Sequence, residues 1–138
     1  MDQRVLRVSI VGCGKVGASI AWLLLNKRQM PMEVNIMEPS PHNNGRVLEL
    51  QHCQVLHPEN KLYINNKERF IESDVIFHTS GVNRKIIGSR MEVALDNITI
   101  TKGVFGGCNF KNDPLVIVVS NPVDIVSYFT AKLPCLNP

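Results

Sequence analysis

Three glycines near the N-terminus stand at a spacing that can bind phosphate groups. Residues 8–17 read VSIVGCGKVG, an apolar run of the β type that ends at Gly12, Gly14 and Gly17. Gly12 allows a tight turn after a strand, Gly14 lets backbone amides approach a pyrophosphate, and Gly17 lets the following helix pack closely against the strand. The unpaired amides and the dipole of that helix N-terminus can hold dinucleotide phosphates without a basic side chain.

A carboxylate follows the glycines at the distance expected for a ribose ligand. After a helical stretch and a polar break, residues 33–37 read EVNIM, an alternating strand that ends at Glu38, 21 residues after Gly17. This is close to the roughly 20-residue offset of the acid that accepts the adenosine ribose hydroxyls. A carboxylate there opposes a 2′-phosphate by about 1–4 kcal/mol per charge pair, so the sequence favours NAD over NADP as the cofactor. The alternative is a solvated acid beside an ordinary tight turn.

A parallel sheet would position these residues, and the chain alternates strands and helices throughout. Continuous apolar strands such as LVIVV, with helices between them, are typical of a parallel sheet covered on both faces. We predict strands at residues 5–11, 33–38, 61–64, 74–79 and 115–120, and helices at 15–27, 43–55, 89–105 and 123–132. The predicted fold is an α/β, Rossmann-type doubly wound parallel sheet of about five strands, in the order 3-2-1-4-5. The sixth strand of the full order is missing, which leaves strand 5 as an edge.

Composition and charge limit the other classes of function. A chain of 138 residues is predicted to form one domain, residues 1–138. The net charge of +3 is too small and too dispersed to argue for nucleic-acid binding, and no apolar run approaches the ~18 residues of a membrane span. We therefore expect a cytoplasmic protein without nucleic acid or membrane as a partner. The cysteines lack metal-binding spacing, so reduced thiols and no metal site are predicted at Cys13, Cys53, Cys108 and Cys135.

Two arginines and an asparagine follow the predicted strands 4 and 5. Arg84 and Arg90 lie in and after a loop with a glycine at each end, and such glycines can act as the hinges of a lid. Loops at the carboxyl ends of parallel strands hold ligands, and a guanidinium can bind a carboxylate or polarise a carbonyl. Asn121 follows strand 5, where its amide can both donate and accept. The alternatives are a basic surface loop and an Asn-Pro turn in which Ser120 or Asn121 caps the last helix.

Several motifs in the same order resemble one family, the NAD-dependent lactate and malate dehydrogenases. The resemblance runs from about Val5 to Lys132 and includes GCGKVG, Glu38, ELQH at 49–52, TSGVNRK from Thr79, LDN at 95–97 and VVSNPVDIVSY from Val118. It implies NAD as the cofactor. It also implies a set of cofactor-binding residues: Gly12, Gly14, Lys15, Val16, Gly17, Glu38, Ser80, Gly81, Asn97 and Asn121.

The same resemblance implies roles in binding a substrate. The position that matches Arg90 polarises the reacting carbonyl, and the position that matches Arg84 binds the far end of the substrate. Asn121 matches a residue that contacts both substrate and nicotinamide. ELQH and VSNPVDI are more similar to lactate dehydrogenases, but the Arg84-Lys85 pair is similar to malate dehydrogenases, where an arginine at that position holds a second carboxylate. An arginine buried opposite a methyl group would remain unpaired. Arg84 therefore favours a dicarboxylate such as malate over lactate.

A proton-transfer group is missing from the chain. Oxidation of a 2-hydroxy acid by hydride transfer needs a base for the hydroxyl proton, and the resemblance implies a histidine paired with an aspartate in a GEHGD-type segment. These 138 residues contain no such segment, and His78 is expected to be a satisfied histidine at the end of strand 4.

We therefore predict the NAD-binding domain of a 2-hydroxy acid dehydrogenase that is not catalytic alone, so its status as an enzyme stays open. The alternative is a non-enzymatic nucleotide-binding or protein-interaction module derived from that family. The predicted partners are a small 2-hydroxy or 2-oxo acid if the catalytic half is supplied, and either a protein with the missing half or a second copy of the chain through the helix at 43–55.

Overall fold

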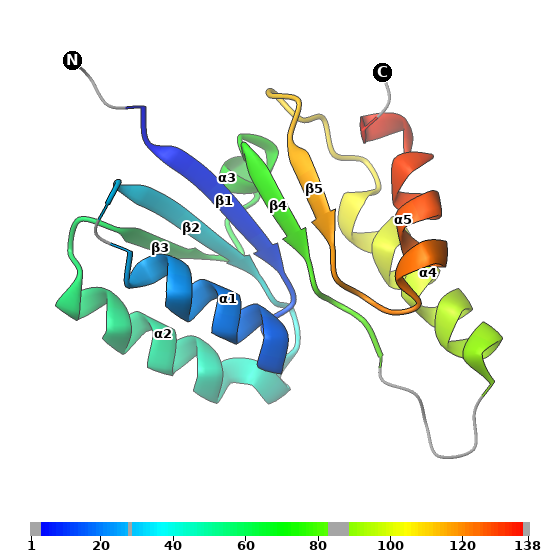
Figure 1. The fold of residues 1–138 in the computed structure, drawn as a ribbon, viewed down its shortest axis with the longest axis horizontal. Coiled ribbons are helices and arrows are strands. Elements are labelled where there is room, and N and C mark those ends of the chain that lie inside the picture. Colours follow the sequence, from blue (N-terminus) through cyan, green and yellow to red (C-terminus); the bar gives the residue numbers. More distant parts are fainter. Residues whose placement is uncertain (1–3, 28, 83–88, 137–138) are drawn as a thin grey trace.

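Five strands form one parallel sheet in the order β3-β2-β1-β4-β5 (Figure 1), which confirms the predicted Rossmann-type α/β fold and strand order. The computed structural model describes residues 4–27, 29–82 and 89–136. The strands are β1 (Leu6–Val11), β2 (Met32–Met37), β3 (Lys61–Ile64), β4 (Val75–His78) and β5 (Leu115–Val118). The helices are α1 (Lys15–Leu25), α2 (Asn44–Leu56), α3 (Lys67–Ile71), α4 (Arg90–Phe105) and α5 (Val123–Ala131).

Three short elements were not predicted from the sequence. They are α3 and the 3₁₀ turns η1 (Pro41–Asn43) and η2 (Pro134–Leu136), and each is too short to show a helical period. Strand 5, predicted to reach residue 120, ends at Val118. Beyond it, the amides of Val119 and Ser120 both donate to the carbonyl of His78, so the chain no longer follows the ladder.

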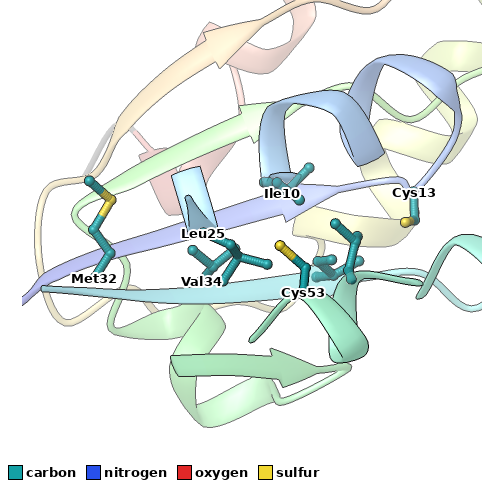
Figure 2. Packing of buried hydrophobic residues seen from close by; sticks show 9 residues of the cluster. Ile10, Cys13, Leu25, Met32, Val34 and Cys53 are labelled. Carbon is teal, nitrogen blue, oxygen red and sulfur yellow. The ribbon is translucent and has the colours of Figure 1, made fainter. Parts of the chain in front are cut away.

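Alternate side chains of β1 pack in two clusters, one on each face of the sheet. Ile10 packs with Leu25 of α1 and with residues of β2 and α2 (Figure 2). Val11 points to the opposite face and packs with Phe70 of α3 and Phe105 of α4. Burial of one such side chain contributes about 1.5–3 kcal/mol. The strand is therefore held from both sides, which fixes the position of its carboxyl end.

Among the described residues, strand β5 pairs only with β4 and forms an edge of the sheet, as predicted. Its residue Val116 packs in the cluster that contains Phe105. Leu115 and Ile117 point to the other face, because successive strand residues alternate, and they are 63% and 37% exposed. The described residues therefore cover this apolar face of β5 only in part.

A glycine inside α4 stands in open space. A Cβ at Gly103 would meet nothing within 4 Å, and glycine in a helix interior is less favourable than alanine by roughly 0.5–1 kcal/mol. Gly103→Ala is expected to raise the free energy of unfolding by about 0.5–1 kcal/mol, as measured by urea denaturation. Gly106→Ala is the control, because its Cβ would lie 2.4 Å from the Lys102 carbonyl oxygen and should destabilise the fold. A less stable Gly103→Ala protein would contradict the open environment of this position.

Candidate functional site

The glycine turn after β1 has the tight geometry that the sequence predicts. Gly12 has φ +92°, and a Cβ there would lie 2.8 Å from the Ser80 Cα. A Cβ on Gly17 would lie 2.0 Å from the Gly12 carbonyl oxygen and 2.7 Å from the Thr79 hydroxyl. Gly14 differs from both, because a Cβ there would meet nothing within 4 Å. Two glycines are thus required by close backbone approach, while the third leaves the start of α1 open.

The N-terminus of α1 carries no internal cap. Gly14 is the N-cap residue and, as a glycine, has no side chain that could cap the helix. The first turn, residues 15–18, contains no acid. Helix α4 begins differently, with a capping box made by Ser89 and Glu92. The first amides of a helix have no intrahelical acceptor and sit at the positive end of its dipole. The amides at Lys15 and Val16 and the space beside Gly14 therefore fit the pyrophosphate of a dinucleotide.

Glu38 lies beside this turn, but much of its carboxylate is already engaged. Oε2 accepts hydrogen bonds from the Cys13 amide and the Asn43 side chain, both at 2.7 Å, and Oε1 accepts from the Ser40 amide at 2.8 Å. A carboxylate has about four acceptor sites. One site on Oε1 therefore remains for a hydroxyl of the predicted adenosine ribose.

The neighbouring thiol of Cys13 is buried and structural. Burial raises the pKa of Cys13, the carboxylate of Glu38 raises it further, and Arg46 acts in the opposite direction. Although Cys13 is near a helix N-terminus, its raised pKa keeps the thiol protonated near pH 7. The residue is fully buried in the core cluster of Ile10. All four cysteines are free thiols.

The loops after β4 and β5 meet the glycine turn at the same edge of the sheet. The Thr79 hydroxyl donates to the carbonyls of Val11 and Gly12, at 2.9 and 3.0 Å. Asn97, buried on α4, connects the two loops, because its Oδ1 accepts from the Val82 amide at 2.7 Å and its Nδ2 donates to the Asn121 carbonyl. Both ends of the Asn97 amide are thus used within the protein. A contact with the cofactor would use their remaining donor or acceptor capacity.

A cavity of about 380 Å³ opens between these loops and the start of α4. Arg90 lines it and donates from Nη2 to both carboxylate oxygens of Asp124, at 3.0 and 3.2 Å. Asp124 is the partner that the described residues give this guanidinium, and the N–H groups not used by it can donate to a substrate. Asn121 lines the same cavity, so two of the predicted substrate residues are brought together. The predicted lid runs from Gly81 to Gly88, and its residues 83–88, which include Arg84, lie outside the described residues.

A polar cluster of Ser80, His78 and Thr101 lies beneath this site and was not predicted from the sequence. His78 is fully buried at the end of β4, as predicted, and its Nε2 lies 2.8 Å from the Thr101 hydroxyl. Its Nδ1 lies 3.3 Å from the Ser80 hydroxyl. Burial lowers the pKa of His78 from 6.5 to about 4, so the imidazole is neutral near pH 7. The one signal in the sequence was a histidine in an otherwise apolar strand, which carries no information about its partner 23 residues later.

Comparison with known proteins extends these observations. A family model described as the NAD-binding domain of lactate/malate dehydrogenase matches residues 6–138. An L-lactate dehydrogenase of Clostridium botulinum (strain 657 / Type Ba4) is 30% identical over 133 residues, which make up 95% of this chain and 42% of that enzyme.

Solved structures of both kinds of enzyme are similar to this chain. The minor L-lactate dehydrogenase of Enterococcus mundtii has a TM-score of 0.78 and 28% identity, over 93% of this chain and 41% of that one. The malate dehydrogenase of Cryptosporidium parvum has a TM-score of 0.76 and 30% identity, over 94% and 42%. This chain therefore spans less than half the length of these relatives.

The helices of the described residues are too short or too polar to cross a membrane. The family model covers nearly the whole chain, and the glycine turn and the uncapped α1 fit the cofactor that its description names. This chain therefore belongs to the lactate/malate dehydrogenase family, corresponds to its NAD-binding domain, and has NAD as its cofactor.

Proposed function

We propose that this chain, as a single domain, binds NAD and presents it to a small 2-hydroxy or 2-oxo acid within an oxidoreductase. The observation that carries the proposal is the uncapped N-terminus of α1, which opens beside Gly14. The amides of Lys15, Val16 and Gly17 would hold the pyrophosphate, and Glu38 would accept a ribose hydroxyl. The other proposed cofactor contacts come from Gly12 and from the loops after β4 and β5: Ser80, Gly81, Asn97 and Asn121.

The substrate is proposed to occupy the cavity beside Arg90. When bound, NAD supplies the group that accepts or donates a hydride. The chain itself contributes the guanidinium of Arg90, whose donors not used by Asp124 would polarise the reacting carbonyl, and the amide of Asn121. We further propose that Arg84 binds a second carboxylate and favours malate or oxaloacetate over lactate. This preference rests on the sequence, because residue 84 lies outside the described residues.

Proton transfer is proposed to come from outside these 138 residues. None of the four histidines lines the cavity in the part of the chain that the structure describes. A longer chain or a partner would supply the missing group. Purified as the 138-residue chain, the protein should bind NADH without oxidising malate or lactate. Measurable oxidation of either acid would refute this part of the proposal.

A second candidate is a nucleotide-binding or interaction module without catalysis. The exposed residues Leu115 and Ile117 on the edge strand favour it, because such an edge can pair with another chain. A homodimer through α2 is also proposed, since a groove of about 540 Å³ between α1 and α2 is lined by Trp22, Leu23 and Leu50. Either assembly is proposed to be cytoplasmic.

Calorimetric titration with NADH tests the central proposal. Binding with a Kd on the order of micromolar is expected, and absence of binding at millimolar NADH would overturn it. Retained binding without any dehydrogenase activity after addition of the candidate partner half would favour the interaction module.

The charge of Glu38 should set the choice between the two nicotinamide cofactors. Glu38→Gln is expected to reduce the preference for NADH over NADPH by roughly tenfold, because it removes a repulsion of about 1–4 kcal/mol with the 2′-phosphate. The ratio of the two dissociation constants measures this effect. Glu68→Gln, a matched change of an exposed acid on α3, should leave the ratio unchanged. An unchanged ratio in Glu38→Gln would argue against Glu38 at the adenosine ribose.

A further inference from the structure

The buried histidine at the end of β4 has no role in the function proposed above. His78 is fully buried, and the ring of Phe105 lies edge-on to it with the centroids 5.5 Å apart. Its two ring nitrogens face the hydroxyls of Thr101 and Ser80. Burying a polar ring here is unfavourable unless both nitrogens are hydrogen-bonded. The arrangement of these partners therefore needs an explanation.

The hydrogen bonds of this cluster can be assigned in only one direction. The Thr101 hydroxyl has one proton, which it donates to the Asn97 carbonyl at 2.7 Å. Its oxygen must therefore accept from Nε2–H of His78. Since the neutral ring carries one proton, Nδ1 is bare and accepts from the Ser80 hydroxyl. The cluster is thus a continuous series of hydrogen bonds from Ser80 through His78 and Thr101 to the backbone carbonyl of Asn97.

Both ends of this series of hydrogen bonds lie at the loops that border the site. Asn97 holds the amide of Val82 after β4 and the carbonyl of Asn121 after β5. Ser80 packs against the glycine turn, where a Cβ on Gly12 would meet its backbone. The bond between His78 and Thr101 is therefore a polar connection between strand β4 and the helix that carries Asn97.

The position of these loops relative to Glu38 indicates which half of the dinucleotide they face. Glu38 follows β2, on one side of β1, whereas the loops that contain Ser80 and Asn121 follow β4 and β5, on the other side. A dinucleotide lies across the point where the strand order reverses, with its pyrophosphate at the glycine turn. If Glu38 binds the adenosine ribose, the nicotinamide half lies over the loops after β4 and β5.

We propose that His78 and Thr101 are positioning residues for the nicotinamide half of the cofactor. Their hydrogen bond fixes Asn97 and, through it, residues 79–82 after β4 and 119–122 after β5. The inference rests on the proposed binding of NAD. It assigns no contact with the cofactor to His78 or Thr101, since both are buried beneath the loops. Loss of the bond should weaken contacts at the nicotinamide half while leaving the adenosine half unchanged.

Thr101→Val tests the inference, because it removes the hydroxyl and keeps the shape of the side chain. The Kd for NADH is expected to rise roughly tenfold, while the Kd for ADP, which contains only the adenosine and pyrophosphate groups, should change less than about twofold. Thr101→Ser, which keeps the hydroxyl, should restore NADH binding. Thr130→Val is the matched control, because Thr130 is a buried threonine of α5 whose hydroxyl donates to the Val126 carbonyl at 2.7 Å.

A double variant separates positioning from stability. His78→Leu with Thr101→Val removes both partners of the bond together. The Ser80 hydroxyl loses His78 as its acceptor but is only partly buried, so the fold should be retained. In this double variant too, the Kd for NADH should rise roughly tenfold relative to wild type, while the Kd for ADP should stay nearly unchanged. Equal NADH affinity in wild type and in both variants would overturn the inference, as would an equal loss of NADH and ADP binding. If the wild-type chain binds neither ligand, the proposed function itself fails.

Discussion

Gly17→Ala should destabilise the chain by about 3 kcal/mol or more and abolish NADH binding. Overpacking in a well-packed region typically costs about 1–3 kcal/mol, and more where the neighbours cannot move. The added methyl group would lie 2.0 Å from the Gly12 carbonyl oxygen, which belongs to a turn at φ +92° that is itself packed against Ser80. The turn and α1 would have to separate. Urea denaturation followed by circular dichroism measures the loss.

Gly14→Ala is the control for this prediction, because a Cβ at Gly14 would meet nothing within 4 Å and the φ of the residue is −68°. The free energy of unfolding should stay within about 0.5 kcal/mol of wild type. NADH should nevertheless bind more weakly, since the methyl group would stand where the pyrophosphate approaches the amides. Similar stabilities for Gly17→Ala and wild type would contradict the close packing of α1 against the turn.

Acid should destabilise the chain through His78 by about 3 kcal/mol at pH 4. The pKa of this histidine is about 4 in the folded chain, where burial lowers it from its ordinary value of 6.5. Between these two pH values the folded state therefore binds fewer protons than the unfolded state. Its contribution is fully present above pH 6.5 and is lost as the pH falls through 4, with a total of about 3 kcal/mol. The groups facing the ring are the hydroxyls of Thr101 and Ser80 and the ring of Phe105, none of which carries a charge.

The comparison variant is His78→Leu with Thr101→Val, which cannot take up this proton. The difference in unfolding free energy between wild type and variant should therefore shrink or reverse by about 3 kcal/mol between pH 7 and pH 4. Subtraction removes the effect of other acids, such as Glu72, whose pKa is lowered by its hydrogen bond and charge interaction with Lys111. A difference that stays constant over this range would show that His78 can be charged inside the fold.

The fold was predictable because its signals are local. An apolar run of strand length followed by three glycines predicts the strand-turn-helix unit from Leu6 to Leu25. The alternation of strands and helices along the chain predicts a parallel sheet. The five-residue α3 was missed because it depends on one capping side chain, that of Asn66, and not on a period.

The site was predictable only where a backbone feature determines it. Gly12 and Gly17 are required by close approaches that their spacing already implied. The partners of Glu38, Arg90 and His78 were not predictable, because each of these side chains meets at least one group more than 20 residues away. Such pairs are set by the register of strands and helices in space, and a single sequence gives no distance between them.

The hydrogen bonds of Glu38 have a consequence for how the cofactor enters. The Cys13 amide, in the middle of the glycine turn, is tied to a strand-end carboxylate that is also held by Ser40 and Asn43. The turn is therefore preorganised, and its ordering entropy is lost when the chain folds and not when the ligand arrives. We expect the backbone of the turn to have the same conformation in the free and the bound protein, so that recognition at the adenosine end is lock-and-key.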